Sequence, residues 1–163
     1  MGILFRKNLK LFIPAWCLIF LLASCDRNRI YETNVDFTDR TWKVTDTVEF
    51  EFRIEDLSPQ YKLSCDLRNT IDYPYSRIFV TYHLLDSTGR ELETNMIPQF
   101  LFDQKTGTPF GSSGIGDIYD HRFPLLSDYE FKTVGKYKMR LEQFMRKDTL
   151  QGIVAVGLRV ERQ

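Results

Sequence analysis

The sequence predicts an all-β fold, an antiparallel β-sandwich of immunoglobulin-like or jelly-roll-like type, preceded by a lipoprotein signal peptide. Short segments alternate between apolar and polar residues, and none shows the 3.6-residue period of a long amphipathic helix. The chain also holds 13 Phe, 8 Tyr and 2 Trp among its 163 residues. Because aromatic residues are enriched in strands, this composition favours β-structure as well.

The clearest strand is expected at 47–54, where Val48, Phe50, Phe52 and Ile54 alternate with polar residues. A period of two places one face of a strand against a core and the other in water. Similar segments follow, separated by turns. The further strands are expected at 61–68, 78–85, 91–96, 118–125, 136–144 and 154–160. In the strand at 78–85, Phe79 and Leu85 add apolar residues to its second face.

Two stretches interrupt this strand pattern. Residues 69–75 contain Pro74, which has no place in a central strand, so we expect a connection there. Residues 97–131 are the least regular part, and four glycines and Pro109 within them predict a long surface loop before the strand at 118–125. A loop of this length in a compact domain is usually functional or mobile.

The first 24 residues have the features of a bacterial export signal. Three basic residues precede an apolar segment at 11–22, which is too short to span a bilayer comfortably. Residues 22–25, Leu-Ala-Ser-Cys, then resemble a lipobox. This motif implies cleavage before Cys25 and attachment of lipid to its thiol. The alternative is a plain secretory signal, or a buried N-terminal helix, in which Cys25 is incidental.

The mature chain has the length of one ordinary domain. Residues 25–45 are polar and lack steady periodicity, so we expect a lipidated N-terminus and tether there, followed by a β-sandwich domain at 46–163. The leader holds three of the 22 basic residues and none of the 22 acidic ones, which leaves 19 against 22. This balance gives no reason to expect a nucleic acid partner. Cys65 is then the single free thiol of the mature chain, which excludes an intramolecular disulfide.

The sequence offers little material for catalysis. His83 falls within an expected strand, where a structural role is the simplest interpretation. Asp117, Asp120 and His121 have a spacing that converges on a helix and not on a strand, and no motif for a nucleophile, a phosphate or a dinucleotide is complete. We therefore expect no enzyme, no catalytic residues, no cofactor and no metal. A hydrolase built on these three residues is the alternative.

Two polar segments are candidates for contact with a partner. Tyr73 and Tyr75 flank Pro74 and can form an exposed aromatic patch for a sugar or a partner chain; alternatively, both rings pin the turn to the core. The other segment is the polar run that follows Gly116. The candidate partner-binding residues are Asp72, Tyr73, Tyr75, Asp117, Tyr119 and Asp120.

Several segments, in order along the mature chain, match a known family. They are the lipobox with Cys25 and the runs at 48–52, 54–56, 68–70, 72–75, 116–120, 135–137, 141–143 and 156–161. In these segments the sequence resembles the gliding motility lipoprotein GldH family of the Bacteroidetes.

The resemblance implies a membrane-anchored, non-catalytic accessory lipoprotein of the gliding machinery and its associated type IX secretion system. It implies other envelope lipoproteins of that machinery as partners, and the membrane as a further partner through N-terminal acyl chains. The implied location is the cell envelope, facing the periplasm, at the outer membrane. A glycan-binding surface lipoprotein is the alternative function, and it requires exposed, coplanar aromatic rings.

Overall fold

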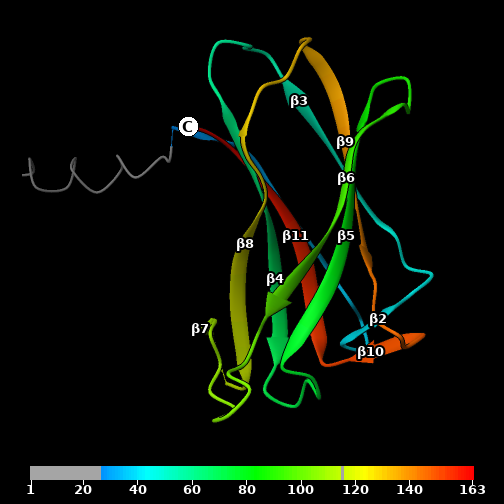
Figure 1. Ribbon diagram of the computed structural model, residues 1–163, viewed down its shortest axis with the longest axis vertical. Helices are drawn as coiled ribbons and strands as arrows, with labels where there is room; N and C mark the ends of the chain where they lie inside the picture. Colours follow the sequence, from blue (N-terminus) through cyan, green and yellow to red (C-terminus); the bar gives the residue numbers. More distant parts are fainter. Residues whose placement is uncertain (1–26, 115) are drawn as a thin grey trace, which may run out of the picture.

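The computed structural model describes residues 27–114 and 116–163. In these two ranges no helix occurs, and therefore none that could cross a membrane; eleven strands form antiparallel sheets (Figure 1). The predicted all-β antiparallel sandwich is confirmed. The signal peptide at 1–24 and the lipidation site Cys25 lie outside the described residues.

Two sheets form the layers of the sandwich, and a small third sheet lies at one end (Figure 1). The five-stranded sheet has the order β1 (Arg29–Asp36), β11 (Ile153–Arg162), β4 (Tyr61–Thr70), β8 (Ile118–Tyr129) and β7 (Ser112–Ser113). The four-stranded sheet has the order β3 (Val48–Ile54), β9 (Gly135–Gln143), β5 (Arg77–Asp86) and β6 (Glu91–Phe100). The small sheet pairs β2 (Thr41–Lys43) with β10 (Thr149–Gln151).

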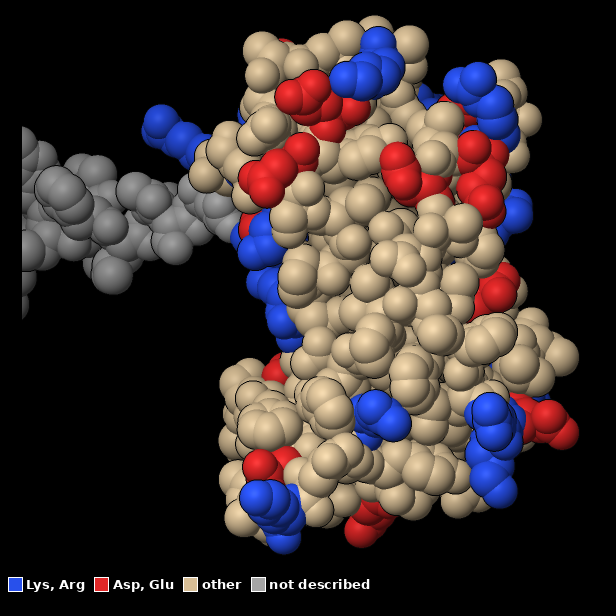
Figure 2. Space-filling model, in the orientation of Figure 1, with Lys and Arg blue, Asp and Glu red and all other residues tan. Residues whose placement is uncertain are grey.

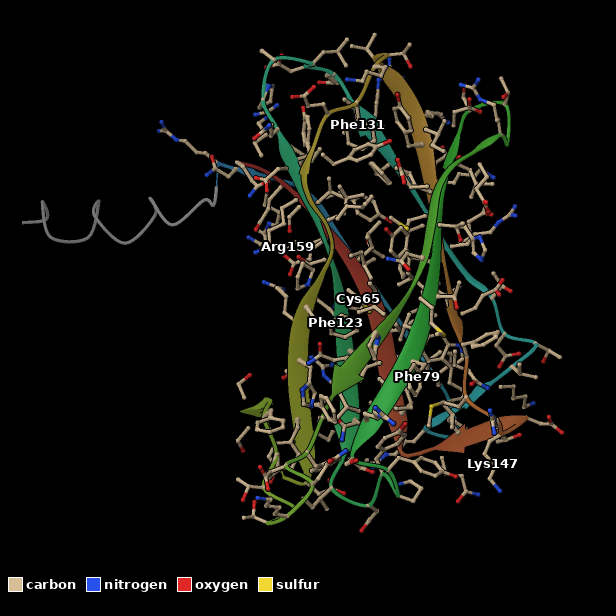
Figure 3. The ribbon with its side chains drawn as sticks, in the orientation of Figure 1. Cys65, Phe79, Phe123, Phe131, Lys147 and Arg159 are labelled. Atoms are coloured by element: carbon tan, nitrogen blue, oxygen red, sulfur yellow. The ribbon has the colours of Figure 1, made fainter. Side chains whose placement is uncertain are left out.

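The core fills the space between the two larger sheets, and the strand alternation positions it. In β3 the apolar residues are buried and the polar residues between them are exposed, as predicted. Phe131 lies at the centre of an aromatic cluster at one end of the core (Figure 3), with ring centroids 5.3 Å from Tyr61 and 4.5 Å from Tyr137. Each such pair contributes about 0.5–1.5 kcal/mol beyond the area that it buries. Cys65 is fully buried, in phase with its apolar neighbours as expected.

The prediction that 25–45 is a tether is wrong for residues 29–43. Residues 29–36 form β1, which pairs antiparallel with β11, and Trp42 in β2 is fully buried. No pattern in the sequence indicates β1, because it is an edge strand with no fully buried side chain. Main-chain hydrogen bonds hold such a strand, and they leave no hydrophobic alternation to detect.

The long loop predicted over most of 97–131 is shorter in the structure. β6 continues to Phe100 and passes through Pro98, which is tolerated because β6 is the outer strand of its sheet. β8 begins at Ile118 as expected and runs for 12 residues instead of eight. Among the described residues, the irregular segment is thereby confined to 101–114 and 116–117, which include the two-residue strand β7.

The sandwich has two ends, and the described chain begins at one of them. At the proximal end the N–H of Arg162 donates to the carbonyl of Asn28 at 2.8 Å, and Arg29 lies opposite Glu161 in the register of β1 and β11. We use the name distal end for the opposite end, formed by residues 71–76, 101–114, 116–117 and 144–152 (Figure 1, lower part). It contains both segments in which the sequence places candidate partner-binding residues.

Candidate functional site

The distal end brings the two candidate segments together, although they lie more than 40 residues apart in the sequence. In the register of β4 and β8, Asn69 lies opposite Tyr119 and Thr70 lies opposite Ile118. The N–H of Ile71, just beyond β4, donates to the carbonyl of Asp117 at 2.8 Å. The segments around Asp72 and Asp117 therefore form one continuous surface.

The prediction of an exposed aromatic patch is wrong for Tyr73. Its side chain is 4% exposed, and its hydroxyl donates to the carbonyl of Arg77 at 3.2 Å. Burial raises the pKa of this phenol. Tyr75 is half-buried and meets Tyr73 edge to face, with centroids 5.6 Å apart and planes at 72°. The rings thus pin the turn to the core, and they do not form the flat exposed platform that the glycan-binding alternative requires.

The carboxylates of the two segments differ in availability. Asp72 is exposed, and Asp117 has only a long ion pair, 3.7 Å from the Arg40 guanidinium. Asp120, in contrast, accepts a hydrogen bond of 2.6 Å from Arg68 on the outer face of the five-stranded sheet. Tyr119 is half-buried, and its ring lies edge-on to Phe102 with centroids 6.4 Å apart. Asp72 and Asp117 are therefore the carboxylates that this surface offers to a partner.

His121 points away from the neighbouring carboxylates, into the sandwich. It is 6% exposed and follows Asp120 in β8, so the two side chains lie on opposite faces of the sheet. Gly111 allows the main chain of the distal end to lie against this ring, because a Cβ at that position would stand 2.7 Å from Nε2. The structure does not bring Asp117, Asp120 and His121 together as the hydrolase alternative requires.

The buried His121 predicts a pH-dependent stability. Within the described residues its Nε2 has no hydrogen-bond partner, and burial lowers its pKa below the ordinary 6.5. The unfolded chain therefore binds this proton more readily, so the free energy of unfolding falls as pH decreases below about 7 and continues to fall until the folded pKa is reached. Urea denaturation between pH 5 and 8 measures this slope, and His121→Gln is expected to flatten it. An identical slope in the variant would contradict the prediction.

The outer face of the five-stranded sheet carries paired charges that the sequence did not single out. Glu32 of β1 accepts hydrogen bonds from Arg122 at 2.7 Å and from Arg159 at 3.1 Å, and Arg122 also donates to Asp66 at 2.8 Å. These bonds raise the pKa of the Arg122 guanidinium. A hollow of about 390 Å³ lies over this face. Because the charges that line it bind one another across strands, we interpret them as stabilising the register of β1, β11, β4 and β8.

A second hollow, which we call the apolar–basic groove, lies on the outer face of the four-stranded sheet near the distal end. It has a volume of about 500 Å³. Two features of the sequence pointed to it: Phe79 adds an apolar side chain to the second face of an expected strand, and Tyr75 is a candidate partner-binding residue. Tyr75, Arg77, Phe79, Met96, Phe144, Met145, Arg146 and Lys147 line the groove.

The comparison with known families decides the identity of the chain. Residues 29–160 match the family model described as GldH lipoprotein. The chain belongs to this family.

Two members of the GldH family match the chain over nearly its whole length. The gliding motility lipoprotein GldH homolog of Christiangramia forsetii is 28% identical over 96% of this chain and 98% of its own. The gliding motility lipoprotein GldH of Flavobacterium johnsoniae is 26% identical over the same shares. Among solved structures, the VP2 subviral particle of infectious bursal disease virus is similar with a TM-score of 0.43 and 13% identity, over 83% of this chain and 32% of that chain.

Proposed function

We propose that this GldH family member is a non-catalytic accessory lipoprotein of the gliding motility and type IX secretion machinery. It is anchored by acyl chains on Cys25, faces the periplasm from the outer membrane and acts through contacts with other envelope lipoproteins. The observation that carries the proposal is the family match over 29–160, with full-length relatives named as gliding motility lipoproteins.

The geometry supports a role in contacts at a distance from the anchor. Arg27 follows Cys25 by two residues, a span of at most about 7 Å, and the chain enters the sandwich at its proximal end. The strand β11 has ten residues, which extend roughly 33 Å at about 3.3 Å per residue. The distal end, with Asp72 and Asp117, is therefore separated from the end nearest the anchor by about the length of β11.

An affinity pull-down of the lipidated protein from native membranes, followed by mass spectrometry, tests the proposal. We expect recovery of envelope lipoproteins of the gliding or secretion machinery. The double variant Asp72→Lys and Asp117→Lys should reduce that recovery about tenfold or more, because a charge reversal in a contact surface weakens binding of the partner. Both carboxylates are at the surface, so the variant is expected to remain folded.

Glu55→Lys serves as the matched control, since Glu55 is an exposed carboxylate at the proximal end. Its recovery of partners should equal that of the unmodified protein. A bait that recovers no stable protein partner would contradict the proposed function. Equal recovery by the distal and the proximal variants would contradict the placement of the contact at Asp72 and Asp117.

A further inference from the structure

Of the candidate partner-binding residues, the apolar–basic groove includes Tyr75 alone. We propose that it binds an acidic peptide segment that carries an aromatic or large aliphatic side chain and belongs to a partner protein. The inference deepens the proposed function and rests on it in one respect, namely that the occupant comes from another protein of the envelope.

The floor of the groove is apolar and open to solvent. Phe79 of β5 is half-buried there, whereas Met96 is 41% and Phe144 is 64% exposed. Figure 3 shows Phe79 and Lys147 on the side of the sandwich away from Arg159. Removing apolar surface from water is favourable, so an apolar side chain of a partner would be stabilised on this floor. Contiguous exposed apolar surface is typical of interaction sites.

The loop that carries half of the groove is held in place by a buried amide. Gln143 is 1% exposed; its Nε2 donates to the carbonyl of Lys147 at 2.9 Å, and its Oε1 accepts from the N–H of Met145 at 2.8 Å. The N–H of Phe144 donates to the carbonyl of Phe79 at 2.8 Å, which continues the pairing of β9 with β5. The loop is therefore ordered before a ligand arrives, and this lowers the entropy cost of binding.

The charge around the groove specifies an acidic occupant. Three basic side chains line it, those of Arg77, Arg146 and Lys147, and no acidic side chain does. None of the three has an ion-pair partner within the described part of the chain, whereas basic residues elsewhere on the same sheet do, such as Lys136 with Glu51 at 2.6 Å. Carboxylates of a bound peptide would supply the missing counter-charges, and complementarity of this kind gives specificity and a fast association rate.

Arg77 joins the apolar and basic parts of the groove. Its guanidinium lies over the Phe79 ring at 5.0 Å and over the Phe100 ring at 5.7 Å from their centroids. Stacking on two rings holds the planar group while leaving its N–H donors free to bind a carboxylate in a bidentate manner. The arrangement matches a peptide in which an acidic residue neighbours an apolar one.

The position of the groove favours a partner protein, and not the membrane that holds the anchor, as its occupant. Phe79 and Phe144 lie toward the distal end, roughly 30 Å along the strands from the proximal end, where the described chain begins. β6 is the outer strand of its sheet, so a peptide reaches Met96 without displacing any described element. Figure 2 shows the edge of the sandwich bordered by β6 and β8, with a broad uncharged stretch across its middle and charged side chains of both signs above and below it.

Fluorescence anisotropy with two labelled heptapeptides tests the inference on the mature chain carrying Cys25→Ala. The first probe alternates glutamate with phenylalanine, and the second has lysine in place of glutamate. We expect the acidic probe to bind more tightly by about tenfold or more, and increasing salt to weaken it. Phe144→Ala and the double variant Arg146→Glu with Lys147→Glu should each weaken binding of the acidic probe about tenfold or more, because loss of anchors and charge pairs in an interface has effects of this size.

Matched controls come from the distal loop outside the groove. Phe110→Ala removes a ring that is 60% exposed, and Lys105→Glu reverses an exposed charge there. Both should leave the affinity of the acidic probe unchanged. Equal binding of the two probes, or equal effects of groove and control variants, would overturn the inference. Binding to phosphatidylglycerol vesicles that the groove variants abolish, without binding of the acidic peptide, would overturn it in favour of a lipid surface.

The pull-down described above separates this inference from the proposed function. Failure of the unmodified protein to recover any envelope lipoprotein would contradict the proposed function, whatever the peptides do. Full recovery by Phe144→Ala, combined with unchanged peptide binding, would contradict the groove as a site and leave the proposed function in place.

Discussion

Trp42→Ala is expected to lower the free energy of unfolding by about 3–5 kcal/mol, the range for truncating a large aromatic side chain in a core. Trp42 is fully buried in β2 and stacks on Phe37 with ring centroids 5.6 Å apart. Its Nε1 donates to the carbonyl of Asp46 at 2.8 Å, and it lies opposite Leu150 of β10. The substitution removes the stacking and the hydrogen bond and leaves a cavity at the distal end.

Urea denaturation followed by far-UV circular dichroism measures this loss. Trp42 is the one tryptophan of the mature chain, so fluorescence serves for the unmodified protein and not for the variant. Val44→Ala is the matched control from the same segment, because Val44 is 46% exposed; its effect should stay within about 0.5 kcal/mol. A loss below about 1 kcal/mol for Trp42→Ala would mean that β2 and β10 do not belong to the cooperative unit.

The sequence located strands whose burial follows a period of two, such as β3, and it missed the edge strand β1. β3 was predictable because its burial follows the period-two pattern over its whole length. β1 pairs along β11 through main-chain groups, and its side chains are half-buried or exposed, so no pattern marked residues 29–36. The interpretation of this segment as a tether failed for that physical reason.

The candidate site was predictable only in part for a similar reason. Turn composition identified the segments near Asp72 and Asp117, yet the register of β4 and β8 places them side by side. Tyr73 was expected at the surface as one of two alternatives, and its ring completes the core. The apolar–basic groove depends on the pairing of β5 with β9, which joins Phe79 to Phe144 across 65 positions of sequence. Local periodicity carries no information about such a contact.

Cys25→Ala is expected to move the protein from the membrane fraction to the soluble fraction with its fold intact. Each buried methylene of an acyl chain contributes about 0.8 kcal/mol, so several chains hold a domain at a membrane and their loss releases it. An unprocessed leader would itself bind the membrane. The Cys25→Ala variant and the unmodified protein are therefore each compared with a version in which a plain secretory signal replaces residues 1–24. Fractionation, together with labelling by radioactive palmitate, measures the change.

Cys65→Ala provides the matched control for this experiment. The Cys65 thiol is fully buried, and burial raises its pKa, so it is neither accessible nor reactive enough to take a lipid in the folded protein. That variant should stay in the membrane fraction and keep its palmitate label, at the cost of some stability. A Cys25→Ala protein that carried the plain secretory signal and still remained in the membrane fraction without label would be held there by protein contacts. The anchor would then be dispensable for location, and the distal end would no longer be oriented by it.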